Sequence, residues 1–490
     1  MHRKLGPAII TFVAVYILAR VLSYLTYGSI VLTSIISAVV AIYFVYIYFR
    51  EPRLVLPFII GEWLLGGNGG LFQFFGLSLR TLLIVMFIFL WLIDFTNQRK
   101  FWSSILPQPW LNRILATLGI FIIFSTVRGL FLGNSPVDVM HDLIPFTYLI
   151  VLFPLIYFWH EFESEQAFGY IVALVYAYIV GTALTSLFTL FAFSYGGALI
   201  HGDYYLWFRN ILAGKVTALS NGFYRVIEPA QMWLVPIVAV LVALVGKNRS
   251  KFSTWFVLMM AFIPLAINLS RTYYIAIFFA TLTLIIFSGE WKKCFVGALK
   301  SAVLFLVVLF VIAISATGAR SFGVDLLLSR VAGDADGGSA ELSVLSRELR
   351  LPIIFEKISL HPIAGNGIGS RLDVYDPVTE TNVSTSQYDW GYLEMISELG
   401  IIGTILLCGL WFYTAIRSAS QARKENHPSE RIFKWGIFAG VIGLCIANIF
   451  APIMYHAMGI IFLIVVLILI SEKLSLIRRI GVSFEALAQD

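Results

Sequence analysis

Residues 252–288 read FSTWFVLMMAFIPLAINLSRTYYIAIFFATLTLIIFS. The apolar runs 252–269 and 272–288 are each long enough to cross a bilayer. Between them lies only the turn Leu269-Ser270-Arg271-Thr272. A charge at the centre of a membrane helix costs about 3 kcal/mol on insertion scales, and such residues usually line a site. The stretch therefore predicts two membrane helices joined by a tight turn that carries an arginine.

The rest of the chain repeats this apolar pattern. Of 490 residues, 59% are hydrophobic and 13% are charged, whereas soluble domains have about 25% charged residues. We therefore expect an all-α polytopic membrane protein with about 12 to 14 membrane helices. The weakest candidate is 53–66, because it is short and contains Glu62. The candidate spans are 8–26, 29–49, 53–66, 79–96, 110–127, 141–159, 167–194, 229–246, 252–269, 272–288, 297–317, 389–416, 433–451 and 453–472.

Basic residues in the loops predict the orientation, because cytoplasmic loops are enriched in lysine and arginine. If every candidate span crosses, the basic loops fall on one side and both termini are cytoplasmic. The turn with Arg271 then lies on the outer face of a bacterial inner membrane. The net charge of +6 is spread over these loops, which argues against nucleic acid as a partner.

The order of spans and loops divides the chain into five parts. Two long segments, 196–228 and 318–388, fall on the outer face, and the second precedes the last three spans. Within it, residues 340–360 have the spacing of an amphipathic helix. The parts are the N-terminal helices 1–195, the central helices 196–317 with the outer loop 196–228, the large loop 318–388, the C-terminal helices 389–472 and a cytoplasmic tail 473–490.

Arginines on the expected outer face are the main functional candidates. Arginine suits phosphate because its planar guanidinium offers charged, bidentate donors. Two or three together could hold a pyrophosphate and stabilise its charge as it leaves. The alternative is snorkelling of single arginines among lipid headgroups. The candidates are Arg225, Arg271, Arg347, Arg350 and Arg371.

Other polar candidates surround the large loop. The turn Gly365-Asn366-Gly367-Ile368-Gly369 could present backbone N–H groups to an anion, or it could be an ordinary turn. Asp389 could cap the following span, or it could orient or deprotonate a sugar hydroxyl. Glu394 and Glu398 lie one turn apart on that span, where a structural partner is expected. His361 and His456 have no zinc-site spacing, and we expect neither a metal nor a soluble cofactor.

The C-terminal half resembles the O-antigen ligase and Wzy-type polysaccharide polymerase superfamily. The matching pieces are Ser270-Arg271, Leu349-Arg350, HPIAGNGIG at 361–369 and YLEMISELGIIG at 392–403. In the family these correspond to a serine-arginine pair, an arginine before an apolar helix, a Pro-x-x-Gly-x-Gly turn and a Tyr-Leu…Glu-x-Gly-x-x-Gly stretch. The resemblance covers about residues 225–410.

The resemblance implies an inverting membrane glycosyltransferase whose donor is a glycan on undecaprenyl pyrophosphate. Arg271 matches the family's second pyrophosphate-contacting arginine, and Arg225 resembles the first. Family ligases have a His-Asn pair ahead of the Tyr-Leu stretch, where this chain has Asp389 and Trp390. This departure argues against a histidine-dependent ligase and makes Asp389 the candidate for acceptor activation.

The function expected from the resemblance is polymerisation of O-antigen or exopolysaccharide repeat units. Arg225, Arg271 and Asp389 are the expected catalytic residues. Membrane lipid, a chain-length regulator and a flippase of the same pathway are further candidate partners. The alternatives are a ligase that moves finished polymer to a lipid or protein acceptor, and a polytopic transporter or lipid flippase. The expected substrate-binding residues are Arg347, Arg350, His361, Gly365, Gly367, Arg371 and Tyr392.

Overall fold

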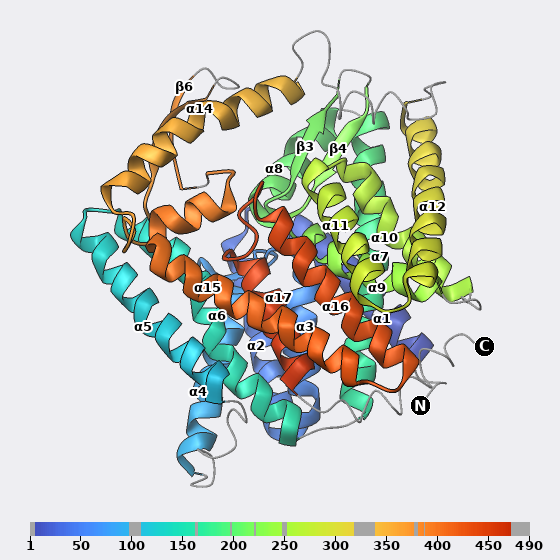
Figure 1. Ribbon diagram of the computed structural model, residues 1–490, viewed down its shortest axis with the longest axis horizontal. Helices are drawn as coiled ribbons and strands as arrows, with labels where there is room; N and C mark the ends of the chain where they lie inside the picture. The colour runs from blue at the N-terminus through green and yellow to red at the C-terminus, as the bar shows by residue number, and fades with distance from the viewer. Residues whose placement is uncertain are drawn as a thin grey trace.

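The computed structural model describes residues 5–97, 109–161, 165–196, 198–219, 222–246, 252–317, 339–376, 381–386 and 388–471. These residues form a helical bundle with three short antiparallel hairpins (Figure 1). The tail 473–490 and part of the loop 318–388 lie outside the described residues. The helices are α1 Leu5–Leu25, α2 Ile30–Arg50, α3 Val55–Leu65, α4 Leu79–Asn97, α5 Pro109–Phe131, α6 Pro136–Glu161, α7 Glu165–Tyr195, α8 Ala198–Leu212, α9 Leu234–Val245, α10 Phe252–Asn268, α11 Arg271–Phe287, α12 Trp291–Thr317, α14 Ser339–Leu360, α15 Gly391–Lys424, α16 Pro428–Ala447 and α17 Ala457–Ser471, with 3-10 turns η2 Pro52–Leu54 and η3 Pro229–Trp233.

Every span expected from the sequence coincides with a helix, and the polytopic helical fold is confirmed. Within the described residues, seven helices are long and apolar enough to cross a membrane, and four shorter apolar helices accompany them. The weak candidate 53–66 is the helix α3. The amphipathic helix expected at 340–360 is α14.

The hairpins were not expected from the sequence. They are β1 Gln73–Phe74 with β2 Leu77–Ser78, β3 Lys215–Ala218 with β4 Tyr224–Ile227, and β5 Leu372–Asp376 with β6 Thr381–Thr385. The last two pairs lie in the segments expected as outer loops. Strands this short have too few residues for a clear alternating pattern, which explains why the sequence did not indicate them.

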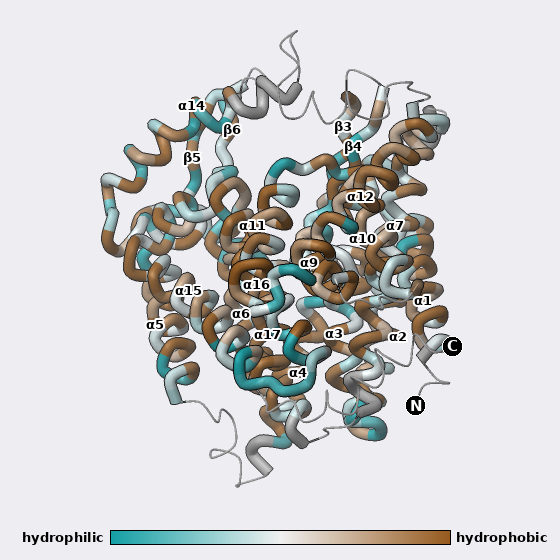
Figure 2. The backbone as a smooth tube through the Cα atoms, turned by 45° about the vertical axis from the view of Figure 1, so that its right-hand side comes forward, coloured by the Kyte–Doolittle hydropathy of each residue, from teal (hydrophilic) through white to brown (hydrophobic). Residues whose placement is uncertain are grey.

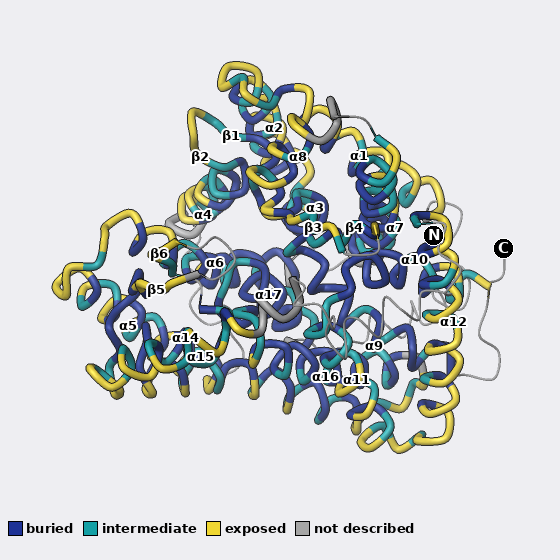
Figure 3. Tube along the Cα trace, turned by 90° about the horizontal axis from the view of Figure 1, so that it is seen from above, coloured by how far each residue is buried: buried dark blue, intermediate teal, exposed yellow. Residues whose placement is uncertain are grey.

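Burial separates helices that face lipid from those inside the bundle. Residues 460–470 of α17 are almost all buried (Figure 3). In contrast, α2 and α12 expose many large apolar side chains, such as Val31, Ile42 and Val303. An exposed apolar surface of this size in a polytopic protein is a lipid-facing surface.

The helix α15 is broken inside the membrane region. Gly400 has φ 67° and ψ −179°, which interrupts the helix and frees backbone groups. The turn after α14 pairs with these groups: Asn366 N donates to the carbonyl of Ser397 at 2.7 Å, and Ile401 N donates to that of Pro362 at 2.9 Å. A break within a membrane is tolerated when other protein groups satisfy the freed backbone in this way.

Candidate functional site

The helix α14 and the hairpins β3–β4 and β5–β6 gather at one end of the bundle, at the top of Figures 1 and 2. Figure 2 shows hydrophilic residues in this region above the mainly apolar helices. Four of the residues expected at the site, Arg225, Arg271, Arg350 and Asp389, belong to segments at this end, which we call the arginine end. Its geometry follows from the contacts between these segments.

The structure brings Arg225 to the start of α11. Arg225 lies on β4, and its Nε donates to the backbone carbonyl of Asn268. Arg271 is only three residues further along, a stretch that spans at most about 11 Å. The two arginines expected to share a pyrophosphate therefore belong to one local unit, although 46 positions separate them in sequence.

The turn that presents Arg271 is held in an uncommon conformation. Leu269 has φ 48°, a left-handed value that costs a non-glycine residue roughly 1 kcal/mol. The buried Asn268 amide supports the turn by donating to Gln231 of η3. The Nε of Arg271 is buried and has no hydrogen-bond partner among the described residues. Strain at Leu269 and an unused donor at Arg271, within the same turn, are typical of a binding site.

A second unit forms where α14 lies against the start of α15. Arg350 Nη1 donates to Oδ2 of Asp389 at 2.6 Å, and the Trp390 indole contacts the carbonyl of Arg347 at 3.4 Å. Asp389 is 43% exposed and has φ 61°. It does not cap α15, whose N-cap residue is Trp390. The Nε atoms of Arg347 and Arg350 are buried and, like that of Arg271, lack partners in the described part of the chain.

The end of α16 joins these two units. A Cβ on Gly443 would lie 2.8 Å from the carbonyl oxygen of Ala276 in α11, so the two helices approach closely there. Two residues later, the carbonyl of Cys445 accepts the hydroxyl of Tyr392 at 2.8 Å. The axes of packed helices lie about 8–10 Å apart. Because α16 contacts both α11 and α15 near their first turns, the starts of these two helices lie within about 20 Å of each other. This separation suits a site for a lipid pyrophosphate and a sugar acceptor.

The remaining expected residues occupy supporting positions. Arg371 pairs with Asp138 of α6. The carbonyl of His361 accepts the N–H of Gly365 at 2.9 Å, and the N–H of Gly367 donates to the backbone carbonyl of Glu398 at 3.0 Å. These turn N–H groups already bond within the protein, so an anion would have to displace those bonds. The hydroxyl of Tyr392 likewise joins α15 to α16.

Sequence reasoning missed two buried arginines beside the site. Arg20 of α1 pairs with Glu228 at 2.9 Å, immediately after β4. Arg80 of α4 pairs with Glu62 at 2.9 Å. Each arginine is nearly inaccessible, so these pairs hold α1, α3 and α4 against the site. Both arginines lie within apolar runs of the sequence, at 8–26 and 79–96. A charged residue inside a membrane span is by default a candidate functional residue, so this position could have identified them.

Two cavities of the described structure lie away from the arginine end. A cavity of about 180 Å³ inside the bundle is lined by apolar and aromatic residues of α3, α7, α9, α16 and α17, among them Leu64, Val175 and Phe462. It has no charged residue to hold a phosphate. No cluster of three or more His, Cys, Asp or Glu in the described ranges could bind a metal ion.

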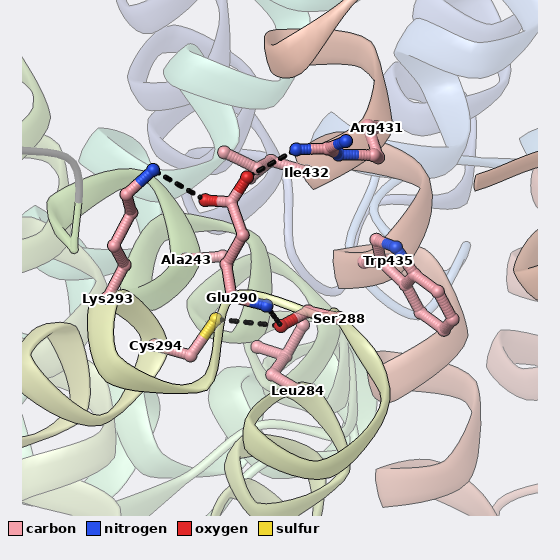
Figure 4. Close-up of a pocket in the computed structure, with 9 residues that line it drawn as sticks. All are labelled: Ala243, Leu284, Ser288, Glu290, Lys293, Cys294, Arg431, Ile432 and Trp435. Carbon is pink, nitrogen blue, oxygen red and sulfur yellow. Dashed lines mark hydrogen bonds and ion pairs between the residues drawn. The ribbon is translucent and has the colours of Figure 1, made fainter. Parts of the chain in front are cut away.

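A small polar pocket lies at the other end of α11, roughly 25 Å from Arg271 by helix length. Its volume is about 10 Å³, enough for one water molecule. The Glu290 carboxylate accepts a hydrogen bond from Nζ of Lys293 at 3.1 Å and also forms an ion pair with the guanidinium of Arg431 (Figure 4). Burial raises the pKa of Glu290, but these two cations outweigh it and hold that pKa below its usual value of 4.5. The pocket therefore joins α11, α12 and α16 as a charge cluster.

We expect Glu290→Gln to lower the apparent melting temperature at pH 7 by about 1 °C, because a partly exposed ion pair contributes about 1 kcal/mol or less. A carboxylate with a depressed folded pKa stabilises above its unfolded pKa and loses this effect as pH falls through the folded value. The difference between variant and wild type should therefore shrink as the pH falls below about 4.5 and disappear once the pH is below the depressed folded pKa. Glu356→Gln, which changes an exposed residue of α14, is the control. An equal difference at pH 7 and in acid would contradict the assignment.

A comparison with protein families matches part of the chain. Residues 255–408 match the family model described as O-Antigen ligase, Wzy_C. This range contains Arg271, Arg350 and Asp389, whereas Arg225 lies outside it. No curated protein matches the chain. The chain is a multi-pass membrane protein whose residues 255–408 match the O-antigen ligase (Wzy_C) family model.

Proposed function

We propose that this protein is a repeat-unit polymerase of O-antigen or exopolysaccharide on the outer face of a bacterial inner membrane. It transfers a glycan from undecaprenyl pyrophosphate to a lipid-linked acceptor repeat unit, with inversion at the anomeric carbon. The observation that carries the proposal is the bond from Arg225 to the Asn268 carbonyl, which places two arginines together at the ends of membrane helices. In this proposal the helix ends lie at the membrane surface, where the pyrophosphate of a lipid-linked donor is found.

Each unit of the site has a task in this reaction. Arg225 and Arg271 hold the pyrophosphate and stabilise the charge that develops when its bond to the sugar breaks. The unused Nε donor of Arg271 supports this role. Arg350 holds Asp389, which orients the acceptor hydroxyl or takes its proton. The scheme needs no metal and no soluble cofactor.

A ligase is the second candidate, because the matched family is described as O-Antigen ligase. The positions aligned with the family's His-Asn pair hold Asp389 and Trp390, which favours the polymerase. The two functions leave different products. Without a polymerase, single repeat units remain, whereas without a ligase, long polymer accumulates on its lipid carrier.

The test is a gel of surface and lipid-linked glycans from a strain lacking the gene, with and without the wild-type gene restored. A polymerase is expected to restore a ladder where the deletion strain has only single repeat units. Polymer stranded on the lipid carrier in the deletion strain would establish the ligase. An unchanged glycan pattern in the deletion strain would refute both.

We expect Asp389→Asn to lower the rate of chain lengthening about tenfold to a hundredfold. The amide cannot form the ion pair with Arg350 and cannot accept a proton. The rate is measured with purified protein and membranes of the deletion strain, which supply the lipid-linked repeat units. Asp373→Asn, at an exposed position of β5, is the matched control. Full activity of Asp389→Asn would remove Asp389 from the mechanism.

A further inference from the structure

A histidine and a buried glutamate face each other at the arginine end. His456 precedes α17, and its carbonyl accepts the N–H of Ile460 at 3.0 Å. Its Nε2 lies 3.3 Å from Oε1 of Glu394, in the first turn of α15. The Glu394 side chain is fully buried, whereas that of His456 is 27% exposed. The imidazole can therefore reach both a fixed carboxylate and solvent or substrate.

The same carboxylate fixes the backbone next to Asp389. Glu394 Oε2 accepts the N–H of Tyr388 at 2.8 Å, and Oε1 accepts the hydroxyl of Tyr455 at 2.6 Å. The Tyr455 ring lies against the imidazole, with 4.7 Å between the ring centroids. One glutamate thus joins the segment before α15 to the segment before α17. His456 is held near Asp389, although 67 positions separate them in sequence.

The Glu394 carboxylate lies beside Nε2 of His456, but the two groups form no hydrogen bond in the described structure. A small rotation of the imidazole would let Nε2–H donate to this carboxylate, which would keep the proton on Nε2 and leave Nδ1 as the acceptor. No hydrogen bond to Nδ1 is found in the described part of the chain. The carboxylate also stabilises the imidazolium that forms when Nδ1 takes a proton, as in other His-carboxylate pairs. Asp389, by comparison, already has one oxygen bonded to Arg350.

On the basis of the proposed function, we propose that His456 is the general base for the acceptor hydroxyl and that Glu394 is its positioning residue. The hydroxyl oxygen forms a bond to the anomeric carbon of the donor. The bond from that carbon to the pyrophosphate oxygen breaks, and its electron pair leaves with the pyrophosphate held by Arg225 and Arg271. The hydroxyl proton passes to Nδ1 of His456 and is later released to water. Asp389 orients the hydroxyl for this transfer.

The test compares variants in the assay with deletion-strain membranes. His456→Gln is expected to lower the maximal rate about a hundredfold and to leave the half-saturating concentration of membranes nearly unchanged. His456→Gly is expected to regain activity when imidazole is added. His141→Gln, at an exposed histidine at the start of α6, is the matched control and should keep the wild-type rate.

Glu394 requires a readout that a purely structural role would not change. In the double variant Glu394→Gln His456→Gly, imidazole is expected to restore much less activity than in His456→Gly, because the carboxylate no longer stabilises the cation. Melting temperatures of all variants identify misfolding. If Glu394→Gln does not fold, the His456 variants still decide the assignment of the base.

The outcomes separate this inference from the proposed function. Lengthening by the wild type together with a full rate in His456→Gln would overturn the inference and leave the polymerase intact. A folded His456→Gly that is inactive with or without imidazole would also overturn it. Failure of the wild type to lengthen any glycan would instead refute the proposed function.

Discussion

Replacing Arg271 with alanine is expected to lower glycan transfer by about a hundredfold to a thousandfold while the protein stays folded. This is the cost of removing one preorganised donor to a developing anion. Arg271 is half-buried at the first position of α11, and its Nε has no partner among the described residues. The substitution therefore removes few interactions that stabilise the fold.

The measurement is the rate of chain lengthening, together with the melting temperature in detergent. Arg271→Lys keeps the charge but loses the bidentate geometry, so it should recover only part of the activity. Arg209→Ala is the matched control, because Arg209 is an exposed arginine of α8 close to β3 in the chain. A folded Arg271→Ala protein with the wild-type rate would exclude the pyrophosphate role.

Much of the fold could be predicted because membrane helices depend on local composition. A run of about 20 apolar residues is sufficient to place a span, and no distant partner is needed. The turn at Arg271 was identified for the same reason, as a charge between two such runs. The short hairpins at 215–227 and 372–385 could not be predicted from local composition, because their strands depend on pairing across a turn.

The architecture of the candidate site depends on contacts between distant residues. The glycines at 365–369 and the glycine at 400 were both visible in the sequence, but their pairing was not. Glu394 was expected to have a structural partner, yet nothing local indicates that this partner is the segment Tyr455-His456. Arg20 and Glu228 are 208 positions apart, and only the packed bundle brings them together. A buried charge can thus be recognised from sequence more easily than its partner.

Replacing Gly367 with alanine is expected to prevent formation of a stable folded protein, at a cost of about 3 kcal/mol or more. Gly367 has φ 81°, and a Cβ there would lie 2.3 Å from the Cα of Gly129 in α5. Backbone atoms cannot move aside as a flexible side chain can. The substitution would separate the turn from α5 and from the break in α15, where Gly367 N bonds to the Glu398 carbonyl.

Two further glycine substitutions separate the causes of this loss, measured as melting temperature and as the monodisperse fraction in size-exclusion chromatography. Gly133 has φ 85°, but a Cβ added there would meet open space. Gly133→Ala should therefore cost only about 1 kcal/mol of backbone strain. Gly409→Ala lies in the helical part of α15 with open space and should be neutral or slightly stabilising. If Gly367→Ala folds normally but loses activity, the close packing with α5 is wrong, and the anion-binding role predicted from the sequence becomes the better explanation. If it does not fold while both controls do, the glycine turn supports the broken helix that carries Glu394 and thereby holds the site together.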